Sequence, residues 1–148
     1  MVAGILAASV VPRFTGENGF EGRGFRDETA AALRYAQKSA IASRRLVCVD
    51  FELDRVTARI ATNFVDTACS STRLADPSGK LDSSRITSYL EVIASSGSRF
   101  STAGTTFAIP GALTFNAAGQ PNAGVSIAVS GLPASLAIAV EAETGYVH

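Results

Sequence analysis

The residues best suited to covalent or metal chemistry in this chain are few and far apart. The sequence has two cysteines, Cys48 and Cys69, and one histidine, His148, which is its last residue. Nucleophilic catalysis needs a serine or cysteine beside a base, and a structural zinc ion normally takes four cysteine or histidine ligands. No histidine is placed to activate Cys48, and no Gly-x-Ser-x-Gly motif occurs. We therefore predict that the protein is not an enzyme and holds neither a metal ion nor a cofactor.

Two further groups of residues have a weaker claim to chemistry. Glu141 and Glu143 are two positions apart, so that on a strand they share a face and could bind a cation or simply face solvent. Gly22-Arg23-Gly24 resembles part of a phosphate-binding loop, but no strand precedes it and no Gly-Lys-Ser/Thr follows. We interpret the glutamates as a solvated surface and the glycines as part of a loop.

The overall charge disfavours a broad nucleic-acid surface. Thirteen basic and thirteen acidic side chains cancel, whereas such a surface needs a basic excess. The absence of tryptophan and the presence of only three tyrosines argue against a platform for base stacking. A local basic patch remains open, either as a binding site or as a solvated helix end: Arg34, Lys38, Arg44 and Arg45.

The residues from Phe25 to Arg45 predict an α-helix. They contain no glycine or proline and are rich in alanine, a strong helix former. One face is narrow and mostly alanine, so that another element can approach it closely; it consists of Phe25, Thr29, Ala32, Leu33, Ala36 and Ala40. The glycines of segment 15–24 predict a flexible or turning connection before this helix.

Beyond residue 45 the apolar residues alternate with a period of two, which indicates β-strands. Residues 46–53 and 56–60 predict a β-hairpin, and a long polar loop follows over 63–85. Further short strands are predicted at 86–94, 105–109, 113–115, 125–129 and 136–140. Helices at one end of the chain followed by antiparallel strands define an α+β fold.

The two cysteines are either buried free thiols or one disulfide. Cys48 lies on the first strand of the predicted hairpin and Cys69 lies just beyond the second. Because a hairpin returns the chain, Cys69 can come back near Cys48. In an oxidising compartment we favour the disulfide, which would close a loop of about 20 residues and stabilise the fold by roughly 3 kcal/mol.

The first fourteen residues are the most uniformly apolar stretch of the chain. Residues 1–11 carry no charged side chain, and Pro12 follows. Such a run could be a buried core helix, the apolar part of a signal peptide, or part of a membrane span. A complete span needs about 20 apolar residues, and a signal peptide should begin with basic residues.

Taken in order, several segments resemble type IV pilins and the pseudopilins of type II secretion. Gly4-Ile5-Leu6-Ala7-Ala8, with Pro12-Arg13-Phe14 behind it, resembles the second half of the family's N-terminal helix. Segments 34–42 and 44–49 are similar to the GspH/FimT class of minor pilins, and segments 115–121 and 143–148 fit the same class. More narrowly, this set resembles the minor pilins of mannose-sensitive haemagglutinin (MSHA) pili.

The resemblance implies a pilin-like fold, in which an N-terminal helical spine, broken near Pro12 and at the glycine-rich segment, packs on an antiparallel β-domain of about six to seven strands. Residues 1–14 would be the rear part of a membrane and filament-core helix, 15–45 a linker and an amphipathic helix, and 46–148 the β-domain. The membrane and filament residues would be Gly4, Ile5, Leu6, Ala7, Ala8, Val10, Val11 and Pro12. The family's leader and its Phe-Thr-Leu-Ile-Glu start do not precede them, so we expect Met1 to be an internal start or a truncation.

The implied function is that of a minor pilin of an MSHA-like type IV pilus, which helps to initiate or cap filament assembly. Its expected location is the inner membrane, with a periplasmic domain, and then the extracellular pilus. Expected partners are other major and minor pilins, the inner-membrane assembly platform and lipid, without nucleic acid or a small-molecule substrate. The oxidising periplasm supports the Cys48–Cys69 disulfide. Two alternatives are a GspH-class secretion pseudopilin and a DNA-uptake minor pilin that uses the basic patch.

Overall fold

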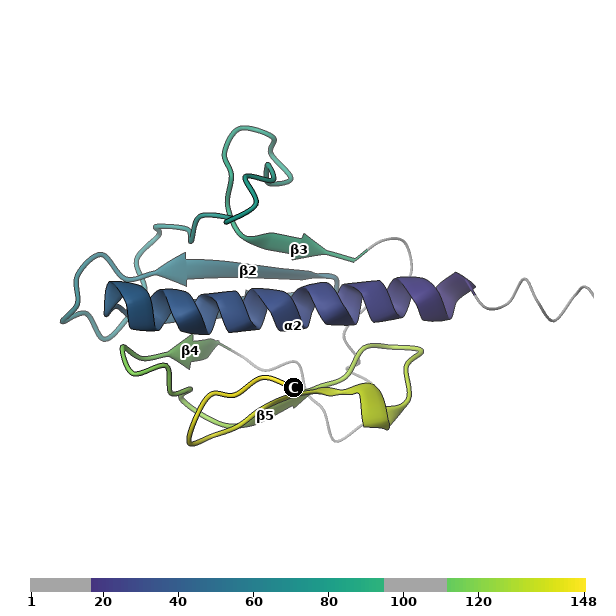
Figure 1. Ribbon diagram of the computed structural model, residues 1–148. Coiled ribbons are helices and arrows are strands. Elements are labelled where there is room, and N and C mark those ends of the chain that lie inside the picture. The colour runs from purple at the N-terminus through teal and green to yellow at the C-terminus, as the bar shows by residue number, and fades with distance from the viewer. Residues whose placement is uncertain (1–16, 95–111) are drawn as a thin grey trace, which may run out of the picture.

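Within residues 17–94 and 112–148, one long helix lies across one face of an antiparallel sheet (Figure 1). The computed structural model describes residues 17–94 and 112–148. The elements in this part of the chain are α2 (Glu17–Ser43), β1 (Val47–Phe51), β2 (Arg55–Ile60), β3 (Glu91–Ile93), β4 (Leu113–Phe115), β5 (Val125–Ile127), the short 3₁₀ helix η2 (Ala134–Leu136) and β6 (Ile138–Val140). The predicted α+β fold is confirmed.

The strands form two antiparallel sheets. The larger sheet has the order β3-β2-β1-β4, and the smaller sheet pairs β5 with β6. The predicted hairpin is present, with Val47 opposite Ile60 and Phe51 opposite Val56. Strand β4 reaches the other side of β1 from far along the sequence and places Phe115 opposite Val47. Six strands are therefore formed within the described residues, in line with the predicted six to seven.

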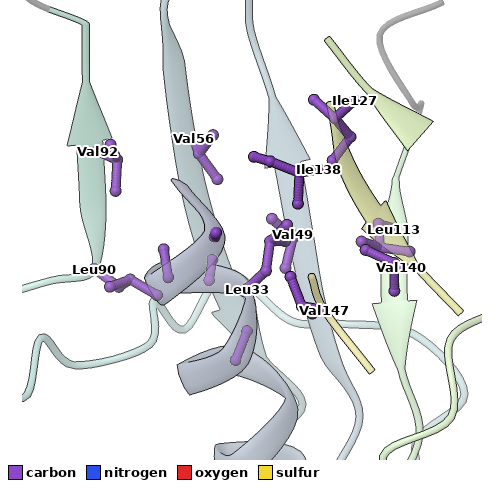
Figure 2. Close-up of a cluster of buried hydrophobic side chains, with 14 of the residues drawn as sticks. Leu33, Val49, Val56, Leu90, Val92, Leu113, Ile127, Ile138, Val140 and Val147 are labelled. Carbon is purple, nitrogen blue, oxygen red and sulfur yellow. The ribbon is translucent and has the colours of Figure 1, made fainter. Parts of the chain in front are cut away.

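The core lies between α2 and the sheets. Every residue of the predicted helix face is buried: Phe25, Thr29, Ala32, Leu33, Ala36 and Ala40. Figure 2 shows Leu33 reaching from the helix among side chains that include Val49 of β1 and Val147 of the C-terminal segment. Burying a leucine contributes about 1.5–3 kcal/mol, and the alanines beside it let the helix backbone approach the strands.

The helix begins earlier than the sequence predicted. Residues 17–24 are helical, so the expected turning connection in this segment, and the expected break of the spine at its glycines, are wrong. A glycine inside a helix costs only about 1 kcal/mol, which a 27-residue helix packed on a sheet can tolerate. Gly22 is also buried, and a Cβ at this position would lie 3.4 Å from the Leu132 side chain. The break expected near Pro12 lies outside the described residues.

Three predicted strands are shorter than their sequence patterns, and for segment 125–129 only Val125–Ile127 belongs to β5. Of segment 86–94 only residues 91–93 belong to β3, and Tyr89 forms a single bridge with Ala75. Ile86 is exposed, because the side chain of the next residue, Thr87, bonds to Asp82 and holds this stretch in the preceding loop. Leu136, predicted to begin the last strand, ends η2 instead. The strand predicted at 105–109 lies outside the described residues.

Candidate assembly surfaces

Three polar side chains of α2 fasten the C-terminal third of the chain to the helix. Arg26 Nε donates a hydrogen bond to the backbone carbonyl of Leu136 at 3.1 Å. Arg34 Nε donates to the carbonyl of Val147 at 3.1 Å. Gln37 Nε2 donates to the carbonyls of Gly119 and Thr144, at 3.0 and 2.8 Å. The helix therefore binds the β5–β6 region through its polar edge as well as its apolar face.

Two glycines make this close approach possible. Gly119 and Gly145 have φ values of +80° and +69°, in the left-handed region where side chains are disfavoured. A Cβ on Gly119 would come within 2.6 Å of Ile41 Cδ1, and one on Gly145 within 2.6 Å of Gln37 Nε2. Both glycines lie in the closing segments 115–121 and 143–148, so those motifs serve to pack the end of the chain against α2.

The Cys48–Cys69 disulfide is present in the structure. It joins β1 to the long loop after β2, with a Cα–Cα distance of 6.1 Å. The amide of Ala61, at the start of this loop, also donates to the carbonyl of Leu46 at 2.8 Å. Residues 61–69 are therefore held at one end by this hydrogen bond and at the other by the disulfide. The bond fixes a polar segment that has little apolar material of its own.

An ion pair lies beside the disulfide, on the two strands of the hairpin. Arg59 of β2 binds both carboxylate oxygens of Asp50 on β1, with Nε–Oδ2 at 2.7 Å and Nη2–Oδ1 at 3.0 Å. This charge-assisted hydrogen bonding raises the pKa of Arg59 further above its usual value. The pair is half exposed, so it fixes local geometry more than it contributes to stability.

Two buried carboxylates organise the loop between β2 and β3. The side chains of Asp82 and Glu91 are 2% and 4% exposed. Arg73 Nη1 lies 3.1 Å from Asp82 Oδ2, and Arg55 Nη1 lies 3.3 Å from Glu91 Oε1. Because a buried charge without a partner is costly, these pairs determine where the loop can lie. We interpret them as structural.

Hydrogen bonds also favour the charged form of Asp82. The Ser84 hydroxyl donates to one carboxylate oxygen of Asp82, and the Thr87 hydroxyl donates to the other at 3.2 Å. With the bond from Ser84 as the largest cause, these contacts hold the pKa of Asp82 below its usual value. Asp82 is therefore a charged anchor of the loop.

The predicted basic patch is divided by the structure. Arg34 binds the C-terminal segment through Nε, while Lys38 is exposed one turn further along α2. Arg44 and Arg45 follow the helix and cap it, because their amides donate to the carbonyls of Ile41 and Ala40, and Arg44 has φ of +53°. This is the Schellman arrangement. DNA binding by these residues stays a prediction.

His148 and Glu141 form a surface pair with no further catalytic partner evident in the described part of the chain. His148 Nε2 lies 3.1 Å from Glu141 Oε1, both side chains are about half exposed, and the imidazole stacks on Tyr146. Within residues 17–94 and 112–148, no three side chains of the metal-binding types gather into a site. The prediction of no metal and no enzymatic activity stays a prediction.

Two neighbouring hollows lie between α2 and the β3 side of the sheet. The first, of about 250 Å³, is mostly apolar and is lined by Ala31, Ala32, Tyr35, Leu90 and Val92, together with residues 76–78 and Lys80. The second, of about 350 Å³, contains Phe20 and Ile93. Glu28 and Lys80 line both hollows. We call the two together the α2–β3 groove.

Sequence analysis missed one conspicuous surface feature. Phe64 and Val65 are 76% and 70% exposed at the tip of a turn whose ends are Asn63 and Asp66. The flanking Asn and Asp, both common in turns, were the available signal. The side chains gave no periodic pattern, because both lie in a loop.

The helix packs along an antiparallel sheet, and the C-terminal segment is hydrogen-bonded to the helix. This arrangement is a pilin-like fold. In the solved structures the chain is similar to the minor pseudopilin EpsH of the type 2 secretion system of Vibrio cholerae. The TM-score is 0.54 at 15% sequence identity, over 86% of this chain and 94% of that one. No protein-family model and no curated protein matches the sequence.

The expected membrane segment, with Gly4, Val11 and the other residues assigned to it, lies outside the described residues. Within residues 17–94 and 112–148, α2 is long enough to cross a bilayer but is not apolar enough.

Proposed function

We propose that this protein is a minor pilin-like subunit of a membrane-assembled filament. The observation that carries the proposal is the packing of α2 along the sheet, with the N-terminal end of the helix projecting beyond the strands (Figure 1). In this proposal the apolar segment anchors the subunit in the inner membrane and then lies in the filament core. The β-domain faces the periplasm, where a disulfide such as Cys48–Cys69 is stable.

The finer proposal is an MSHA-like type IV pilus, with this chain in an MshC-like role that initiates or caps assembly. Its support is the order of the sequence segments, from Gly4-Ile5-Leu6-Ala7-Ala8 to the closing residues 143–148. Partners in this role are other pilins and the assembly platform in the membrane. The second candidate is a type II secretion pseudopilin, which is favoured by the similarity to EpsH.

Deleting the gene and assaying two outputs separates these candidates. An MSHA-like role predicts loss of surface pili with normal protein secretion, and a pseudopilin role predicts the reverse. Complementation with Leu6→Arg should fail and leave the protein outside the membrane fraction, because a charged residue in an apolar span costs about 2.5–3.5 kcal/mol. Leu6→Ile is the matched control and should restore both complementation and the presence of the protein in the membrane fraction. Normal pili and normal secretion in the deletion strain would refute the proposed function.

A further inference from the structure

The exposed pair Phe64–Val65 is held by a rigid turn. The carboxylate of Asp66 accepts a hydrogen bond from the amide of Asn63 at 2.8 Å, and the amide of Asp66 lies 3.4 Å from the carbonyl of Asn63. Three residues later Cys69 is bonded to Cys48. We call residues 63–66 the Phe64 turn. The hydrogen bonds within the turn and the disulfide after it restrain its backbone, and in this conformation both apolar side chains face solvent.

This presentation has the character of a binding anchor. Leaving two large apolar side chains in water forgoes about 1.5–3 kcal/mol of burial for each. Aromatic residues that stand out from a surface are also the usual energetic centres of protein interfaces. The Phe64 turn therefore fits a partner that offers an apolar hollow.

The α2–β3 groove of the same chain offers such a hollow. Its first part, of about 250 Å³, has apolar walls that include Ala31, Leu90 and Val92. An apolar cavity of about 150 Å³ is enough for a benzene molecule, so this part can receive the ring of Phe64. The groove borders the N-terminal half of α2, from Phe20 to Tyr35. The Phe64 turn lies near the other end of the helix, because Ala61, two residues before the turn, donates to the carbonyl of Leu46. The two features are therefore separated along α2 within one molecule.

The charges around the two features are complementary. Exposed Arg44 and Arg45 lie at the same end of the molecule as the Phe64 turn. Glu21 and Glu28 line the groove on the helix side, opposite a single cation, Lys80. The Phe64 turn itself contributes one carboxylate, Asp66, against the two arginines, whereas Asp76 and Glu91 add to the acidic side chains of the groove. A net basic end therefore meets a net acidic groove, which favours encounter in one orientation.

We propose that the Phe64 turn of one copy of this chain docks into the α2–β3 groove of a second copy. Because the two surfaces differ, the contact is head-to-tail, so one copy can dock on the next in a fixed direction where assembly begins. The inference deepens the proposed function and rests on it for its biological role. A single turn in a groove buries less than the roughly 1,200 Å² of a stable interface, so the contact should be weak outside a crowded membrane or filament.

The test is photo-cross-linking of the full chain in membranes, with benzoylphenylalanine placed at position 64. The expected product is a homodimer whose cross-linked peptide contains residues 28–35 or 76–92. Ala31→Arg fills the groove from an exposed helix position and should lower the dimer yield roughly tenfold. Ala123→Arg, at an exposed position that is neither among the groove's lining residues nor on α2, is the control for the added charge and should leave the yield unchanged.

Retention of the Cys48–Cys69 bond on non-reducing gels verifies that each variant is folded. An unchanged yield with Ala31→Arg, cross-links outside the groove, or no homodimer would overturn the inference. Cross-links to other pilins alone would overturn docking between copies and leave the pilin assignment intact. Homodimers in the complemented strain, together with normal pili and normal secretion in the deletion strain, would refute the proposed function and support the inference.

Discussion

Replacing Gly145 by alanine should destabilise the protein far more than the same change at Gly131, although both residues have positive φ. The φ values are +69° and +80°, so each alanine incurs about 1–2 kcal/mol of backbone strain. A Cβ on Gly131 meets nothing within 4 Å, whereas a Cβ on Gly145 would collide with the Gly119 carbonyl oxygen and lie 2.6 Å from Gln37 Nε2. Alanine at position 145 therefore adds an overpacking cost of about 1–3 kcal/mol.

The same substitution should also disturb the hydrogen bonds of Gln37, which are worth about 1 kcal/mol each. Together the expected difference between the two alanine variants is about 2–4 kcal/mol. The measurement is urea unfolding of the full chain in a mild non-ionic detergent, followed by circular dichroism. Equal destabilisation of the two variants, within about 0.5 kcal/mol, would refute the view that the chain's end is latched to α2 through Gly145.

Three further predictions concern the disulfide, the loop carboxylate and the helix end. The double variant Cys48→Ala/Cys69→Ala should lose about 3 kcal/mol in urea unfolding, because the bond closes a loop with a sequence separation of 21; a loss below about 1 kcal/mol would contradict this. Because the pKa of Asp82 is lowered in the folded state, its contribution to stability is present above the unfolded-state pKa, near 4, and is lost as pH falls through the lower folded-state value. Asp82→Asn should therefore flatten the fall of unfolding free energy measured between about pH 4 and 2, and an unchanged slope would count against the anchor role. Arg44→Gly should stabilise the helix end by about 1 kcal/mol, as measured by thermal unfolding, because φ is +53° there; Arg45→Gly is the control and should not stabilise.

Some of the fold follows from local sequence alone. The spacing of Phe25, Leu33 and Ala36 identified the buried face of α2, because a helix returns to the same side every three or four residues. The alternation in residues 47–60 likewise identified the hairpin, and the hairpin brought Cys69 within reach of Cys48. In each case neighbours in the sequence are also neighbours in space, so a local pattern was sufficient.

Only the tertiary structure decided where α2 begins and how the chain's end is used. Gly22 indicates a loop by local propensity, but the gain from packing the helix exceeds the cost of a glycine within it. By sequence alone Arg34 belongs to a basic patch. In the structure it donates a hydrogen bond to the backbone carbonyl of Val147, more than a hundred residues later, and this bond gives it a structural role. The proposed role of the Phe64 turn could likewise not be predicted from local sequence, because it depends on a groove formed by residues distant in the sequence. The sequence by itself thus predicted the buried helix face and the hairpin and favoured the disulfide, because these depend on residues close together in the chain. The bounds of several elements and the structural roles of side chains such as Arg34 were decided by contacts between distant segments.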